Sequence, residues 1–163
     1  MRCSGSSRHV KGFTLIELLV VIIILGITSA LAVPNISRWL EAYNVRKAGR
    51  QLVSDLQLAR MKAVAEGLQY RIDFDQTNAN YTLQKGNASS GSSTWTTIGS
   101  QRQLRNPDNP FYSKGVSLTT NFTNDKVTFA PTGSPTPWGT TTFTTTNYTR
   151  VVAVSSTGRV RLD

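Results

Sequence analysis

The sequence predicts an α+β protein in which one long amino-terminal helix, first transmembrane and then amphipathic, packs on antiparallel β-sheets. Three observations predict it. Residues 13–33 are apolar except for one acidic side chain, and a helix of that length is about 31 Å long, close to the hydrocarbon thickness of a bilayer. Residues 35–67 repeat apolar side chains every three or four positions. Residues 68–163 alternate apolar and polar side chains between turn sequences.

Residues 1–12 form a short leader that precedes the apolar run. Its basic residues are Arg2, Arg8 and Lys11. A secretory signal peptide also begins with positive charge, but its small-residue cleavage site follows the apolar core, where Ala30-Leu31-Ala32 could serve. A plain single-pass anchor is the other alternative. It explains the length of residues 13–34 but not the presence of Glu17 among them.

Glu17 is the one charged residue of the apolar run. A charged side chain inside a membrane helix costs on the order of 2.5–3.5 kcal/mol near the helix centre, even on insertion scales. We therefore expect Glu17 to have a partner of opposite charge.

The second part of the helix, residues 35–67, contains one apolar stripe. Its members are Val45, Ala48, Leu52, Leu56, Ala59 and Ala63. Ile36, Leu40 and Tyr43 fall on roughly the opposite face. We expect the stripe to pack on the sheet and the earlier turns, including Trp39, to meet other subunits or a membrane surface. A frayed linker is the alternative.

The remaining residues, 68–163, predict a β-rich domain. Tyr70, Ile72 and Phe74 alternate with polar residues, a turn covers residues 76–80, and Tyr81 and Leu83 continue in an antiparallel partner. Further strands are expected at Trp95–Ile98, Val116–Thr119, Lys126–Phe129, Thr140–Thr146, Arg150–Ser155 and Arg159–Leu162. The threonine-rich run at residues 140–149 suits an exposed strand, because threonine is both β-branched and polar.

The residues Gly12-Phe13-Thr14-Leu15-Ile16-Glu17 and the apolar residues after them resemble the processing site of type IV prepilins and of type II secretion pseudopilins. The resemblance implies that a prepilin peptidase cuts between Gly12 and Phe13 and that the new amino terminus on Phe13 is methylated. It also implies a single-pass protein of the bacterial inner membrane, with a periplasmic domain, that is later extracted into a fibre. Pro34 stands where such helices commonly kink.

Three later segments resemble the GspH/FimT group of minor pseudopilins and pilin-like proteins. They are residues 58–67, residues 129–133 and residues 151–162. The resemblance implies a pilin-like fold and a structural, non-enzymatic role. The implied partners are other pilins or pseudopilins, bound through the amino-terminal helix, together with the peptidase and methyltransferase and the inner-membrane assembly machinery.

Cleavage after Gly12 would give Glu17 its partner. The new α-amine on Phe13 is cationic and lies at the edge of the apolar run. In a helical stack of subunits it can meet the Glu17 carboxylate of a neighbour, and loss of either charge would leave the other unpaired in a medium of low dielectric constant. Glu17 would therefore set the height at which one subunit joins the next, which apolar contacts alone specify poorly.

Composition excludes several kinds of site from the processed chain. The only cysteine, Cys3, and the only histidine, His9, lie in the leader. Disulfides, cysteine nucleophiles, imidazole bases and Cys/His metal sites are thereby excluded after processing. We expect no enzyme activity, no metal and no cofactor. The net charge of +9 falls to +6 without the leader, with 15 basic and 9 acidic residues left, which favours acidic partners, anionic lipid or nucleic acid.

The carboxyl-terminal Gly158-Arg159-Val160-Arg161 is the sharpest candidate for a binding site. If Val160 and Leu162 face the core, Arg159 and Arg161 share the exposed face, and with Arg150 nearby they would form a phosphate clamp. The pattern also resembles the carboxyl-terminal motif of FimT-type proteins that bind DNA for uptake. The alternative is a pair of solvated arginines that protect an edge strand from aggregation.

Two weaker patterns have simpler interpretations. Asp73–Thr77 resembles the start of a calcium loop, but the glycine and the final glutamate of such a loop are absent, so a polar hairpin turn is expected. Trp95 and Trp138 could form a stacking platform, although single aromatic residues more often belong to a core or its rim.

Overall fold

The computed structural model describes residues 13–163, with the side chains of residues 30–35 left undescribed. The leader, residues 1–12, lies outside the described residues, and the expected processing residue Gly12 lies outside with it. The chain divides into two compact units, with the boundary between Ser37 and Arg38. We call residues 38–163 the globular unit.

One long helix and two sheets make up the fold. The helix α1 covers Leu15–Glu66, 52 residues. The first sheet contains β1 (Tyr70–Asp75), β2 (Asn80–Gly86), β3 (Trp95–Thr97), β4 (Arg102–Gln103), β6 (Lys126–Phe129) and β7 (Pro135–Thr136). The second contains β5 (Ser117–Thr120), β8 (Gly139–Thr144), β9 (Thr149–Val154) and β10 (Val160–Leu162). A short 3-10 helix, η1 (Thr123–Asp125), precedes β6.

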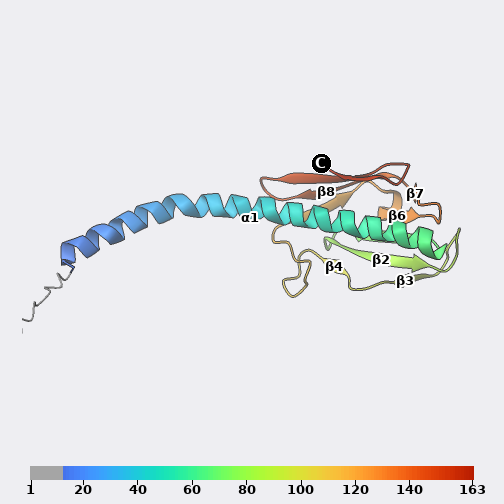
Figure 1. Cartoon of the computed structure of the whole chain (residues 1–163), viewed down its shortest axis with the longest axis horizontal. Helices are drawn as coiled ribbons and strands as arrows, with labels where there is room; N and C mark the ends of the chain where they lie inside the picture. The colour runs from blue at the N-terminus through green and yellow to red at the C-terminus, as the bar shows by residue number, and fades with distance from the viewer. Residues whose placement is uncertain (1–12) are drawn as a thin grey trace, which may run out of the picture. The chain divides into compact units, whose positions relative to one another are not determined.

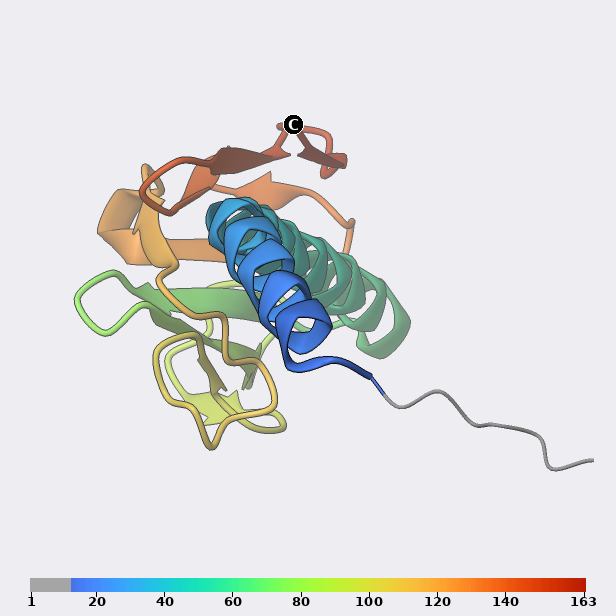
Figure 2. The same cartoon turned by 90° about the vertical axis from the view of Figure 1, so that its left-hand side faces the viewer.

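Both sheets are antiparallel, and the second half of α1 lies against them. The first sheet has the order β3-β2-β1-β6-β7, with β4 also paired to β2, and the second has the order β10-β9-β8-β5. Within the globular unit, β2, β3 and β4 lie on one side of α1 and the carboxyl-terminal strands around β8 lie on another (Figures 1 and 2). The α+β class expected from the sequence is confirmed.

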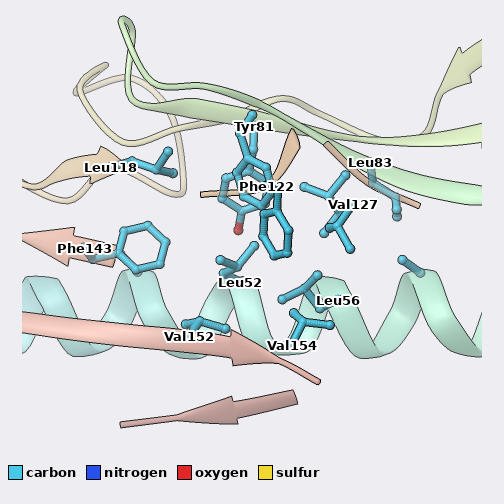
Figure 3. Close-up of a cluster of buried hydrophobic side chains, with 14 of the residues drawn as sticks. Leu52, Leu56, Tyr81, Leu83, Leu118, Phe122, Val127, Phe143, Val152 and Val154 are labelled. Carbon is cyan, nitrogen blue, oxygen red and sulfur yellow. The ribbon is translucent and has the colours of Figure 1, made fainter. Parts of the chain in front are cut away.

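The apolar stripe of α1 forms one wall of the core. All six residues of the stripe are buried, as predicted. Leu52 and Leu56 belong to one cluster with Tyr81 of the first sheet and with Val152 and Val154 of the second (Figure 3). Every buried hydrophobic residue of the described chain lies between Ala42 and Val154. The globular unit therefore contains its own complete core and can fold by itself.

The turns of α1 before this stripe carry large exposed side chains. Ile36, Trp39, Leu40 and Tyr43 are all exposed. The rings of Trp39 and Tyr43 stack on each other with their centroids 5.9 Å apart. The helix thus has both the buried stripe and the exposed earlier turns that the sequence predicts.

A buried ion pair joins α1 to the first sheet, and the sequence pattern did not predict it. The Arg102 guanidinium donates to both carboxylate oxygens of Asp55, over 3.1 and 3.0 Å. The Tyr81 hydroxyl donates to the same carboxylate over 2.9 Å. Burial, aided by the Asp55 charge, raises the pKa of Tyr81 well above its usual value. Asp55 is therefore a structural residue with its hydrogen bonds satisfied.

The expectation of an exposed threonine-rich strand was wrong for three of its residues, Thr141, Phe143 and Thr145. β8 lies between β9 and β5 rather than at an edge, so its alternate side chains face the core, and Thr141 and Phe143 are buried. The strand also ends at Thr144, because the Thr145 amide donates to the Tyr148 carbonyl in a turn over 2.8 Å. A central strand position overrides the polarity of threonine.

The expected turn at residues 76–80 joins β1 to β2. The Asp75 carboxylate accepts hydrogen bonds from the amide and side chain of Asn78, over 3.0 and 2.6 Å. These bonds, with that from the Asn78 side chain first, lower the pKa of Asp75. Among the described residues, no group of three or more acidic, histidine or cysteine side chains could hold a metal ion.

Candidate functional site

Phe13 and Glu17, the two described residues of the expected processing and assembly site, lie at the start of α1. Phe13 precedes the helix, and its side chain is exposed. Thr14 occupies the N-cap position, because its Oγ1 accepts a hydrogen bond from the Glu17 amide over 3.3 Å. Thr14 and Glu17 therefore have the spacing of a capping box, S/T-x-x-E. This spacing is visible in the sequence, and Thr14 is a helix cap that the pattern of apolar residues does not reveal.

The Glu17 carboxylate is exposed, and it forms no ion pair with any other residue that the structure describes. Its place in the first turn is favourable for an acid, since the amino-terminal end of a helix dipole attracts negative charge. Helix geometry thus stabilises the carboxylate in part, while its charge remains available to a second molecule.

The turns that follow expose large apolar side chains on every face. The exposed residues are Leu15, Ile16, Leu18, Leu19, Val20, Val21, Ile22, Ile23, Ile24, Leu25 and Ile27. A helix that is apolar all round is normally buried in lipid or among other helices. The membrane span expected over residues 13–34 is not confirmed, since none of the helical stretches within the described chain is both long and apolar enough to cross a bilayer.

A second candidate site lies on the second sheet, near the carboxyl terminus (Figure 1). Arg159 and Arg161 line one open groove of about 430 Å³. Trp138, Asn121 and Ala153 also line it. We call this feature the Trp138 groove. Val160 and Leu162 pack against the core, so the two arginines share the opposite, exposed face, as the alternation predicted.

Strand register brings the groove residues together. Arg161 of β10 is opposite Ala153 of β9, and Ala153 is opposite Thr140 of β8. Paired residues of neighbouring strands project from the same face of a sheet. The small side chain of Ala153 therefore leaves a hollow between Arg161 and Thr140. Sequence reasoning missed Ala153, because its contribution depends on a pairing between distant segments.

The turn between β9 and β10 positions Arg159. The Ser155 Oγ accepts a hydrogen bond from the Arg159 amide over 3.1 Å. Gly158 has a φ of +79° within this turn, as expected of a glycine at a tight turn. Arg60 of α1 holds the same region, because its guanidinium donates to the carbonyl oxygens of Gly133 and Thr157 over 3.1 and 3.5 Å.

The structure does not bring Arg150 to this groove. Arg150 lies on β9 with the same parity as Val152 and Val154, and these two face the core. Ala153, in the groove, projects from the other face. The Arg150 guanidinium instead donates to the Thr149 carbonyl over 3.3 Å.

The two tryptophans considered as a stacking platform lie apart. Trp95 belongs to β3 of the first sheet. The Arg71 guanidinium covers its ring at 3.9 Å from the centroid, a cation–π contact. Trp138 lines the groove on the second sheet, and 67% of its surface is exposed. Trp138 alone is therefore open to a ligand.

Comparison with known proteins places the chain. Residues 48–158 match the family described as Type II transport protein GspH, and residues 7–33 match the prokaryotic N-terminal methylation motif. No curated protein sequence gave a match.

Two solved structures share the fold. The minor pseudopilin EpsH from the type 2 secretion system of Vibrio cholerae aligns with a TM-score of 0.57 and 16% identity, over 73% of this chain and 95% of that one. The type IV minor pilin FimU of Pseudomonas aeruginosa aligns with a TM-score of 0.55 and 22% identity, over 77% of this chain and 92% of that one. The match to the family profile spans most of the globular unit and the motif spans the start of α1. The chain therefore belongs to the GspH family, and its start carries the N-terminal methylation motif.

Proposed function

We propose that the protein is a non-enzymatic subunit of a helical fibre, either the pseudopilus of a type II secretion system or a type IV pilus. A prepilin peptidase would cut between Gly12 and Phe13, and the new terminus on Phe13 would be methylated. One observation carries the proposal. The Glu17 carboxylate lies exposed in the first turn of an apolar helix, with no ionic partner among the described residues.

Before assembly, the apolar start of α1 would hold the protein in the inner membrane as a single-pass anchor, with the globular unit in the periplasm. The inner-membrane assembly machinery would then lift the helix out of lipid into the centre of the fibre. The exposed apolar residues support this proposal, because both environments cover such a surface.

Glu17 would control the register of each incoming subunit. Its carboxylate would pair with the α-amine on Phe13 of a neighbouring pilin. A buried charge that loses its partner costs about 3–5 kcal/mol, so a subunit at the wrong height is strongly disfavoured.

Glu17→Gln tests this role without disturbing the helix end. Glutamine still suits the N3 position of a capping box, so the substitution removes the charge and keeps the cap. We expect Glu17→Gln protein to enter the membrane and to be cleaved as the wild type is, but to be missing from sheared fibres. Immunoblots of membrane and fibre fractions measure both steps.

Glu41→Gln is the matched control, since it removes an acid from the same helix within the globular unit. We expect it to be incorporated normally. Normal incorporation of the Glu17→Gln protein would contradict the register mechanism. Mass spectrometry of protein from its native host provides the second check, and a chain that still begins at Met1 would overturn the whole proposal.

A second candidate function is DNA binding by a minor pilin, through the carboxyl-terminal arginines. The observation that favours it is the meeting of Arg159 and Arg161 in one groove. Guanidinium groups contact phosphates well, and each such contact makes affinity fall with salt.

A mobility-shift titration of the globular unit tests this second function. We expect binding that weakens steeply with salt and that is lost in Arg159→Ala/Arg161→Ala. Arg46→Ala/Arg50→Ala removes the same number of charges from exposed positions of α1 and should bind almost as the wild type does. Absence of any shift at low salt would rule the function out, and equal losses in both double variants would reduce it to non-specific charge attraction.

A further inference from the structure

We propose that the Trp138 groove binds one nucleotide unit of a single-stranded nucleic acid, with an unpaired base stacked on Trp138 and the adjoining phosphates on Arg159 and Arg161. This inference rests on the second candidate function. It adds a base-stacking residue and a preference for unpaired bases.

The exposed indole is the first argument. Of the three tryptophans in the chain, Trp95 is covered by Arg71 and Trp39 stacks on Tyr43. Trp138 forms no such ring contact with any described residue, and it lies at the edge of a groove that contains two guanidinium groups. An open aromatic face beside cationic side chains is the arrangement by which proteins hold single strands.

Stacking on Trp138 requires a nucleic acid with unpaired bases. In a duplex, both faces of each base are covered by the neighbouring base pairs. A tryptophan beside the start of β8 can therefore stack only on a base that is unpaired or turned out of the helix. Guanidinium groups alone would not distinguish the two forms, because both carry phosphates.

The groove is also large enough for such a ligand. Its volume of about 430 Å³ lies within the range of pockets that hold small organic molecules, roughly 300–1,000 Å³. Ala153 and Trp138 supply apolar lining, while Asn121, Thr140 and Ser155 supply polar groups. The floor is rigid, because Ala153 and Thr140 are paired across neighbouring strands.

Asp163 competes with the ligand for one of the arginines. The Arg161 guanidinium contacts both carboxylate oxygens of Asp163, each over 2.8 Å. Both side chains are exposed, so the pair is weak and a phosphate can displace it. Asp163 thus lowers the affinity of the groove without closing it.

Fluorescence anisotropy of the globular unit tests the proposal with three probes. They are a labelled oligothymidylate of about 12 nucleotides, a duplex of the same length, and free thymidine monophosphate as competitor. We expect the single strand to bind more tightly than the duplex. Free nucleotide should compete only at much higher concentration, since it offers one phosphate and no neighbouring contacts.

Substitutions in the groove separate stacking from charge. Trp138→Ala should weaken single-strand binding about tenfold and leave duplex binding nearly unchanged. Ala153→Phe fills the hollow without altering charge and should weaken it similarly. Val151→Phe places the same side chain two residues away on the same face of β9 and is the matched control. Asp163→Asn should strengthen binding about threefold.

The outcomes distinguish this inference from the function it rests on. If duplex binds as well as single strand, and Trp138→Ala changes neither while Arg159→Ala/Arg161→Ala abolishes both, DNA binding stands and the stacking site is overturned. If no nucleic acid binds, both fail, and the role in the fibre is untouched. Thermal melting of each variant shows that it is folded, and Trp138→Ala, at an exposed position, provides a test that does not depend on Ala153→Phe.

Discussion

Of two buried polar side chains in the core, Asp55 has hydrogen-bond partners and Thr141 has none among the described residues. Asp55 is only 3% exposed, but its carboxylate accepts bonds from Arg102, Tyr81 and Gln51. Thr141 is 1% exposed, and its hydroxyl has no partner among the described residues. A buried polar group without a partner costs about 1–3 kcal/mol. Asp55 is thus compatible with a stable core, whereas Thr141 lowers stability.

Thr141→Val should therefore stabilise the globular unit. Valine has nearly the shape of threonine and removes the unpaired hydroxyl, so we expect the free energy of unfolding to rise by about 1 kcal/mol. Thr120→Val is the control, because the Thr120 hydroxyl donates to the Thr140 carbonyl over 3.1 Å, and its loss should destabilise. Urea denaturation measures both, and a destabilised Thr141→Val variant would mean that the hydroxyl does have a partner.

At the scale of elements, the turn between β9 and β10 links α1 to the Trp138 groove. A methyl group at Gly158 would collide with the Gly133 carbonyl oxygen and would lie 3.1 Å from the Arg60 Nε. The Arg60 guanidinium is hydrogen-bonded to that same carbonyl. The turn, the Gly133 loop and the helix are therefore packed too closely for any side chain at residue 158.

Gly158→Ala should destabilise the unit by about 2–4 kcal/mol, because it adds a steric clash to the cost of a positive φ. Gly115→Ala measures the cost of the positive φ alone. Gly115 has a φ of +74°, and a methyl group there would meet no atom within 4 Å, so we expect a loss of only about 1 kcal/mol. Chemical denaturation of the two variants gives the difference, and equal losses would show that the turn can move away from Arg60.

Sequence patterns predicted those parts of the molecule that depend on local order. The helix and its buried stripe repeat over many turns, and the alternation of Tyr70, Ile72 and Phe74 survives in β1. β4 and β7 were missed because each has two residues and shows no period. Their places are set by the strands that they pair with.

The residues considered for the Trp138 groove divide in the same way, into those that local spacing reveals and those that depend on strand pairing. Arg159 and Arg161 share a face because they are two residues apart in an extended segment, which the sequence reveals. Arg150 was expected beside them, but it shares the face of Val152 on β9, and only the pairing of Ala153 with Arg161 shows that the groove lies on the other face. Ala153 and Trp138 enter the groove through contacts between distant segments, and no spacing along the chain records those contacts.

At the scale of the whole molecule, α1 has a buried stripe and, in its earlier turns, an exposed face. Substitutions in the globular unit can measure how much each of them contributes to stability. Leu52 of the stripe is fully buried, whereas Trp39 is 65% exposed on the same helix. Leu52→Ala should lower the free energy of unfolding by about 2–5 kcal/mol, since it leaves a cavity in the core. Trp39→Ala should change it by less than about 1 kcal/mol, because it removes only an exposed stacking contact with Tyr43. Urea denaturation followed by circular dichroism tests both variants.

Incorporation of the full chain into fibres tests whether Trp39 contacts other subunits. If Trp39 faces neighbouring subunits, Trp39→Ala will fold as the wild type does and yet join fibres poorly. A loss of stability comparable to that of Leu52→Ala would instead mean that the amino-terminal face of the helix belongs to the core of its own subunit.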